Sequence, residues 1–218
     1  MRTVILSDFD GTITRRDIGY NLFHHFSQGR NEKLVPLWKS GNLTTRDCLL
    51  KEAAMVHAAP DEIYRFLDQF ELNRGFEDFV RQCRSNDTDL IILSDGLDFY
   101  VKYVLQRYDL SDLPVIANIG RLENGGLTVT FPYDNQSCDR CGSCKGERIR
   151  EYRERHPETA IVFIGDGYSD ACGVTEADLV FAKKDLEQYC VLHNIDHVKY
   201  DTFIDVSRCL MERGYMRD

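Results

Sequence analysis

Two pairs of aspartates have the spacing of a cation-dependent reaction centre. Asp8 and Asp10 stand two residues apart after a short apolar run, where extended backbone would point both side chains the same way, and Asp166 and Asp170 follow a second such run. Carboxylates suit Mg²⁺, and a bound cation lets a phosphate approach groups that would otherwise repel it. One carboxylate can then attack phosphorus, while another protonates the leaving oxygen and later activates water. The pattern predicts magnesium-dependent phosphoryl transfer.

Two further polar residues could bind the phosphoryl oxygens. Ser94 follows another apolar run and offers a hydroxyl donor, and Lys145 offers a point charge. Each has an ordinary alternative, because an isolated Ser94 could be a helix N-cap and an isolated Lys145 a surface residue. In such a centre most of the catalysis would come from positioning and charge stabilisation.

The elements that must position these residues alternate along the chain. Runs that are apolar on both faces predict buried parallel strands, and they span residues 3–8, 89–94, 114–118, 161–166 and 179–182. Helical stripes separate them, which predicts an α/β fold, a doubly wound parallel-sheet core of Rossmann-like type. Because ligands bind at the carboxyl ends of such strands, we expect the polar residues to converge at one edge of the sheet.

Two insertions interrupt this alternation. Residues 15–74 carry only helical patterns, with Pro60 near one helix start, and we expect a helical-bundle cap there, seated over a core of residues 1–14 and 75–218. The second insertion spans residues 121–129, and its Asn124-Gly125-Gly126 between two short strand-like runs predicts a β-hairpin.

The order and spacing of the polar residues resemble the four motifs of the haloacid-dehalogenase (HAD) phosphatases. The resemblance implies that Asp8 is the nucleophile and Asp10 the acid/base. It implies a phosphate site of Ser94, Lys145, Gly11 and Thr12. It also implies that Asp8, the backbone carbonyl of Asp10, and Asp166 hold Mg²⁺, with Asp170 supporting the site. The motifs are Asp8-Phe9-Asp10-Gly11-Thr12, Ser94, Lys145-Gly146-Glu147 and Gly165-Asp166-Gly167-Tyr168-Ser169-Asp170.

Within this family the chain is similar to the phosphoserine-phosphatase branch, whose members carry a helical cap. It looks closer to the branch with the 2-hydroxy-3-keto-5-methylthiopentenyl-1-phosphate phosphatase of methionine salvage, through Asp17, the cysteine-rich approach to Lys145 and Val180-Phe181-Ala182. The phosphoethanolamine/phosphocholine phosphatases share its Ser94-Asp95 pair. The first expected substrate is therefore the methionine-salvage phosphoester, with phosphoserine, phosphoethanolamine and phosphocholine as alternatives.

Asp17 and Asp95 are expected to face the substrate if the family geometry carries over. Two carboxylates beyond the metal group would favour a leaving group that is cationic or rich in hydroxyl donors. Asp17 also has a purely structural alternative as the N-cap of the first cap helix.

Four of the eight cysteines could form a second site. Cys138, Cys141 and Cys144 are spaced at every third residue, and Cys172 is the one further cysteine with a plausible position. In a reducing compartment such a cluster suggests metal or redox chemistry before structural disulfides. A soft metal with four ligands, a reversible disulfide and free thiols all stay open.

Composition narrows the class of partner. The net charge of −9 disfavours nucleic acid as a partner. The sequence contains no run of about 18 apolar residues, so we expect no membrane span, and its N-terminus does not resemble a signal peptide. We therefore expect a cytoplasmic protein whose partner is a small phosphorylated metabolite; its oligomeric state is open. A non-enzymatic alternative, a regulator that accepts phosphate and signals, is disfavoured by Asp10, because a base beside the phospho-aspartate speeds its hydrolysis.

Overall fold

A mostly parallel sheet forms the centre of the molecule. The structure is a computed structural model that describes residues 2–133, 135 and 137–217, and within them seven strands pair in the order β4-β3-β2-β1-β5-β6-β7. Every neighbouring pair is parallel except β3 with β4. The strands are β1 (Thr3–Ser7), β2 (Asp89–Leu97), β3 (Val115–Glu123), β4 (Gly126–Thr130), β5 (Ala160–Gly165), β6 (Leu179–Ala182) and β7 (Val198–Lys199). The five predicted strands and the hairpin are confirmed; β7 was not predicted.

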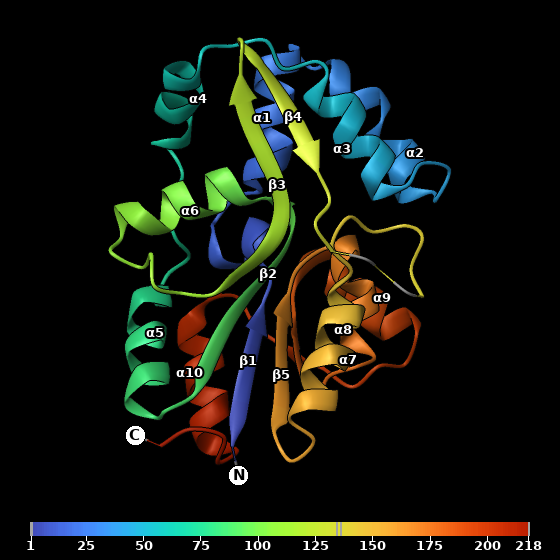
Figure 1. Ribbon diagram of the computed structural model, residues 1–218. Coiled ribbons are helices and arrows are strands. Elements are labelled where there is room, and N and C mark those ends of the chain that lie inside the picture. Colours follow the sequence, from blue (N-terminus) through green and yellow to red (C-terminus); the bar gives the residue numbers. More distant parts are fainter. Residues whose placement is uncertain (1, 134, 136, 218) are drawn as a thin grey trace.

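Helices cover both faces of the sheet. Ile5 of β1 packs in one apolar cluster with α5 (Phe76–Ser85) and α10 (Phe203–Glu212), whereas its neighbours Val4 and Leu6 pack in a second cluster with α7 (Lys145–Arg155) and α9 (Lys184–Leu192). Figure 1 shows these helices on opposite sides of the strands. A strand buried on both faces explains the continuous apolar runs in the sequence.

The predicted cap segment is helical. It contains α1 (Ile18–Ser27), a short 3₁₀ helix (Arg30–Lys33), α2 (Val35–Lys39), α3 (Thr45–Ala53) and α4 (Pro60–Leu67), which begins at the predicted proline. The chain enters and leaves this segment side by side, since Asn73 N donates to Ile13 O at 2.7 Å and Thr14 forms a bridge with Leu72. The boundaries at residues 15 and 74 stay a prediction.

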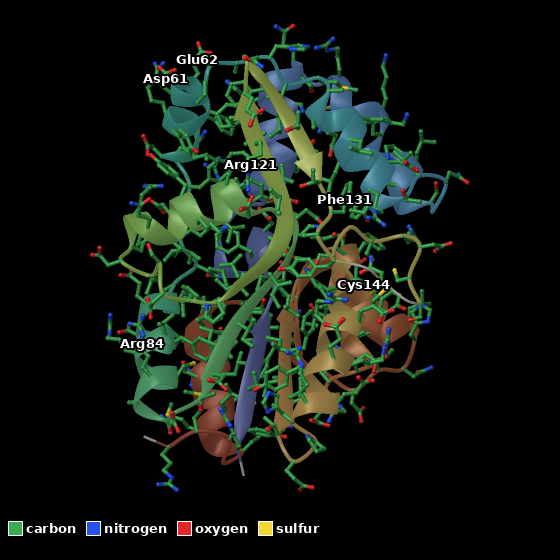
Figure 2. All side chains as sticks on the ribbon, in the orientation of Figure 1. Asp61, Glu62, Arg84, Arg121, Phe131 and Cys144 are labelled. Atoms are coloured by element: carbon green, nitrogen blue, oxygen red, sulfur yellow. The ribbon has the colours of Figure 1, made fainter. Side chains whose placement is uncertain are left out.

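The β3–β4 hairpin rises from the core into the cap (Figure 1). At its tip Ala58 N donates to Gly125 O at 3.1 Å, and His57 forms a bridge with Gly126. Figure 2 shows Phe131 just after β4, beside the cap helices, and the Arg46 guanidinium lies 4.7 Å from its ring centroid. The hairpin therefore adds a third connection between sheet and cap.

In the described part of the chain, no helix combines the length and the apolar character that crossing a bilayer requires.

Candidate active site

The predicted residues converge where the sheet meets the cap. Asp8 follows β1, Ser94 lies near the end of β2 and Asp166 follows β5, and these three strands are neighbours in the sheet. All three residues line a cavity of about 550 Å³ whose opposite wall comes from α1, α2 and α3. The expectation that these polar residues would converge at one edge of the sheet, at the carboxyl ends of its strands, is therefore confirmed.

A buried lysine joins two aspartates below the cavity. Lys145, the first residue of α7, is 1% exposed, and its Nζ donates to Asp8 Oδ1 at 2.5 Å and to Asp170 Oδ1. Burial alone would lower the pKa of Lys145, but the charges of Asp170 and Asp8 outweigh it and raise that pKa, so the ammonium stays charged. Burial and then the charge of Asp170 raise the pKa of Asp8, and Lys145 opposes them.

Three carboxylates form a group with the chemistry of a hard-cation site. One oxygen each from Asp8, Asp166 and Asp170 lies within 4.8 Å of the other two. Asp170 is held in place because its Oδ2 accepts hydrogen bonds from Asp166 N and Gly167 N, both at 2.9 Å. Carboxylate oxygens of this kind fit Mg²⁺. The carboxylate of Asp10 lies outside the group, which leaves its backbone carbonyl as its predicted contribution to the metal.

Gly11 allows the first motif to approach this group closely. Its φ of +76° is in the left-handed region, and a Cβ there would stand 2.4 Å from Asp166 Oδ2, so no other residue fits without displacement. The Gly11 carbonyl also accepts from Lys184 Nζ at 3.2 Å, and the same ammonium donates to Asp166 Oδ2 at 2.7 Å. Thr12 is fully buried, and neither it nor Gly11 is among the cavity-lining residues, so their predicted phosphate role would rest on the backbone.

Asp10 has partners quite different from those of Asp8. Asp10 Oδ1 accepts from Ile18 N at 2.8 Å and from Gly19 N at 3.2 Å, and Asp10 Oδ2 accepts from the Tyr100 hydroxyl at 2.7 Å. The backbone is extended at both aspartates, with φ −62° and ψ 162° at Asp8 and φ −71° and ψ 116° at Asp10, and both residues line the cavity, in agreement with the expectation from their spacing. Burial raises the pKa of Asp10, and these three hydrogen bonds oppose the rise. A carboxyl with a raised pKa is suited to hold and deliver a proton.

Tyr100 was not predicted as a site residue. It lies in α6 (Asp98–Arg107), is 1% exposed and lines the cavity. Its hydroxyl fits between two glycines, since a Cβ on Gly96 or Gly19 would stand 1.7 Å or 3.1 Å from the hydroxyl oxygen. The apolar stripe of α6 signals burial, but it carries no sign that a hydroxyl will meet a carboxylate from another motif.

Asp95 connects the cavity to the loop before Lys145. It is 7% exposed, and its Oδ1 accepts from Ser143 N at 2.7 Å and from Asn118 Nδ2 at 3.2 Å. Burial raises the pKa of Asp95 to about 6, although both hydrogen bonds lower it. Its other oxygen, Oδ2, is buried without a hydrogen-bond partner in the described part of the chain. Asp95 thus supports the loop and also lines the cavity.

Two acids from the cap also line the cavity. Asp17 is the N-cap of α1, where Oδ1 accepts from Tyr20 N at 2.8 Å, so the structural alternative is confirmed and the substrate role stays a prediction. Asp17 is exposed as a residue, yet desolvation of its carboxyl is the main cause, and the charge of Asp10 the second, of a rise in its pKa to about 7. Glu52 was not predicted; it is 7% exposed, accepts from Asn31 Nδ2 at 3.2 Å, and burial raises its pKa to about 7.

The remaining wall of the cavity is largely apolar and joins the cap to the core. Lys39 of α2 pairs with Asp185 at 2.9 Å and lies 4.8 Å from the ring centroid of Tyr168, and Trp38 meets the same ring edge-on at 6.5 Å. These contacts close one side of the cavity. The apolar and aromatic lining residues are Tyr20, Phe23, Val35, Trp38, Cys48, Leu49 and Tyr168.

The cysteine cluster is also assembled. The sulfurs of Cys138, Cys141, Cys144 and Cys172 all lie within 4.8 Å of one another, and these four cysteines form no disulfide. None of them lines the cavity described above.

Comparison with known proteins places this architecture in a family. A family model described as "Putative Phosphatase" matches residues 3–203. The 2-hydroxy-3-keto-5-methylthiopentenyl-1-phosphate phosphatase of Brevibacillus brevis is 30% identical over 216 residues, which cover 97% of this chain and 96% of that protein. Pdp3-interacting factor 1 of Schizosaccharomyces pombe is also 30% identical, over 222 residues that cover 95% of this chain and 94% of that protein.

A solved structure supports the fold. A phospho-aspartyl intermediate analogue of phosphoserine phosphatase has a TM-score of 0.72 with 17% sequence identity, and the match covers 99% of both chains. The predicted doubly wound α/β core with an inserted helical cap is therefore confirmed. The family match and the relatives support an enzyme and not the alternative of a non-enzymatic regulator. The chain belongs to the "Putative Phosphatase" family and is a HAD-type phosphatase, a phosphoric monoester hydrolase.

Proposed function

We propose that this phosphatase acts on a small metabolite through a phospho-aspartate formed on Asp8. The observation that carries this proposal is the position of the Asp8 carboxylate, which lines the cavity and bonds to the charged Lys145. Mg²⁺, when held by Asp8, Asp166 and Asp170, would supply positive charge that offsets the repulsion between the carboxylates and a phosphate. Lys145 stabilises the phosphoryl oxygens, and the Ser94 hydroxyl donates to them.

Asp10 serves both half-reactions as acid and then base. As the Asp8 oxygen forms its bond to phosphorus, the bond from phosphorus to the leaving oxygen breaks, and that oxygen takes the proton of Asp10. Water then attacks the phospho-aspartate and gives its proton to Asp10, which releases inorganic phosphate and frees Asp8. The raised pKa of Asp10 and its place in the cavity wall support this role.

Two substitutions separate these roles. With ³²P-labelled substrate and rapid quenching, Asp8→Asn should give no labelled protein and no turnover. Asp10→Asn should acquire label slowly and lose it still more slowly, and hydroxylamine should release that label. Substantial turnover by Asp8→Asn, or unchanged loss of label in Asp10→Asn, would contradict the assignment.

For the substrate we propose 2-hydroxy-3-keto-5-methylthiopentenyl-1-phosphate. Relatives from Brevibacillus brevis and Lysinibacillus sphaericus that bear this activity in their names are 30% and 31% identical over nearly the whole chain. The apolar wall around Phe23, Trp38 and Leu49 offers a surface for a methylthio chain. No arginine is among the described residues that line the cavity, and its two lysines are paired with carboxylates, Lys39 with Asp185 and Lys184 with Asp166. Both observations disfavour phosphoserine, because its carboxylate would need a cation of its own.

The acids of the cavity support a second candidate, an amino-alcohol phosphate. Asp17, Glu52 and Asp95 would attract a cationic leaving group such as ethanolamine or choline. The test compares kcat/KM for the methylthio ester, its analogue without the methylthio group, and phosphoethanolamine.

Loss of the methylthio group should reduce kcat/KM by about tenfold or more, because a buried apolar group of this size contributes about 1–3 kcal/mol. A preference for phosphoethanolamine that disappears in Glu52→Gln or Asp95→Asn would favour the second candidate. Equal losses on every substrate in these variants would show that the acids are structural.

A further inference from the structure

Four cysteine sulfurs from two separate segments meet beside the start of α7. Cys138, Cys141 and Cys144 belong to the loop between β4 and α7, and Cys172 belongs to α8 (Ala171–Val174). Figure 2 labels Cys144 where this loop reaches the core helices. A tetrahedral zinc–thiolate centre has bonds of about 2.3 Å, which separates its sulfurs by roughly 3.8 Å. The four sulfurs, within 4.8 Å of one another, need little movement to reach that geometry.

The backbone around the cluster is arranged for anionic sulfur. Cys141 N donates to Cys138 Sγ at 3.5 Å, so the Cys-x-x-Cys turn already directs an N–H group at a sulfur. Cys144 is the N-cap of α7, an eleven-residue helix, and the N-terminal end of a helix favours negative charge. Gly146 lets α7 and α8 approach, because a Cβ at this position would stand 2.3 Å from Cys172 O.

We propose that Cys138, Cys141, Cys144 and Cys172 hold a zinc ion whose role is structural. Four protein ligands leave no open position for a substrate, which distinguishes structural from catalytic zinc. Thiolate ligands select zinc over magnesium, so this centre is chemically separate from the aspartate group. Each thiol loses its proton to solvent as the zinc–sulfur bonds form.

The zinc centre fixes the loop that carries the catalytic lysine. Cys144 directly precedes Lys145, and Ser143 N donates to Asp95 Oδ1 at 2.7 Å. Asn135 braces the same loop, since its Oδ1 accepts from Cys144 N at 3.1 Å and its Nδ2 donates to Cys141 O at 2.8 Å. A metal that ties this loop to α8 therefore holds Lys145 against Asp8.

The same loop also reaches the cap. Arg140 lies between the first two cysteines; its Nη2 donates to Trp38 O at 2.8 Å and its carbonyl accepts from Thr45 N at 2.9 Å. Trp38 and Thr45 both line the substrate cavity. The zinc centre is thus a common support for the catalytic lysine and one wall of the cavity.

The test uses the whole chain, purified under reducing conditions after expression with zinc. Elemental analysis should find about one zinc per chain, the stoichiometry of a closed four-ligand site. Cys138→Ser and Cys172→Ser should lose it, while Cys209→Ser, a half-buried cysteine outside the cluster, should keep it. Protein loaded with Co²⁺ should show the sulfur-to-cobalt charge-transfer band that aspartate ligands cannot give.

A mercurial reagent provides a measurement that needs no mutation. Added to the wild-type protein, it should release zinc as the thiols react, and a zinc-sensitive dye should report the release. The proposal is overturned if the reduced, zinc-loaded protein contains no stoichiometric zinc, if the cobalt form lacks the charge-transfer band, or if both cluster variants keep the metal. Iron in the cluster, or a disulfide between its members in the purified protein, would also overturn it.

Discussion

Replacing Tyr100 with phenylalanine should change the proton affinity of Asp10 without disturbing the aspartate group. The Tyr100 hydroxyl donates to Asp10 Oδ2 at 2.7 Å, and the bonds from Ile18 N and Gly19 N to Oδ1 would remain. A hydrogen bond to a charged group contributes about 1.5–3 kcal/mol, and one pKa unit corresponds to about 1.4 kcal/mol. Because the lost bond favours the charged form, the pKa of Asp10 should rise by about 1–2 units in Tyr100→Phe.

The pH dependence of kcat/KM measures this change. In the proposed mechanism Asp10 must be protonated to form the phospho-enzyme, so activity should fall as the pH rises through its pKa. A higher pKa of Asp10 in Tyr100→Phe should therefore shift the basic limb of the profile to higher pH. In single-turnover experiments the hydrolysis step, which needs deprotonated Asp10, should slow at low pH.

Tyr103 provides a matched control on the same helix. Its hydroxyl donates to Asp68 Oδ1 at 2.7 Å on the exposed surface, so Tyr103→Phe should leave the profile unchanged. The assignment of Asp10 as an acid controlled by Tyr100 is wrong if the basic limb of Tyr100→Phe stays at the same pH or shifts to lower pH while the fold and the Mg²⁺ affinity are normal.

Three more predictions concern the metal and the buried acids. EDTA should abolish phosphatase activity and Mg²⁺ should restore it; activity that survives dialysis against EDTA would exclude the metal. Gly11→Ala should raise the Mg²⁺ concentration for half-maximal activity by about tenfold, because left-handed strain costs about 1–3 kcal/mol and the new Cβ would meet Asp166 Oδ2. For Glu52, the folded pKa of about 7 lies above the ordinary value of 4.5, so its stabilising contribution is complete below pH 4.5 and lost as the pH rises through 7. That gap corresponds to about 3 kcal/mol, and between pH 5 and 8 urea unfolding should show wild type losing stability relative to Glu52→Gln; parallel curves would contradict it.

The local pattern of the sequence was enough to predict the core. Strands buried on both faces leave continuous apolar runs, and the polar residues that follow β1 and β5 stand out because the apolar pattern stops there. The two-residue β7 leaves no such pattern, since pairing with β6 and not its own composition defines it.

The site was predicted only as far as its motifs reach. Asp8, Asp10, Asp166 and Lys145 could be found because their spacing is local to one strand end or one helix start. The partner of Asp10 could not, because Tyr100 lies ninety residues away and its hydroxyl is placed by packing between two glycines. Contacts of this kind depend on tertiary structure.

The two backbone bonds from the cap to Asp10 have a consequence for how new specificities could arise in this protein. Ile18 and Gly19 hold the acid through their main-chain N–H groups, so substitution of the Ile18 side chain leaves its donor in place unless proline is introduced. Gly19 is less tolerant, because a Cβ there would stand 3.1 Å from the Tyr100 hydroxyl, the third donor to Asp10. What must be preserved is the path of the chain at the start of α1. A cap transplanted from a relative would therefore need to reproduce this entry path, or the chimera would bind its new substrate with Asp10, the proposed proton donor, out of place. Diversification is easier through residues farther along the cap, such as Val35 and Leu49, which line the cavity but do not bond to the acid.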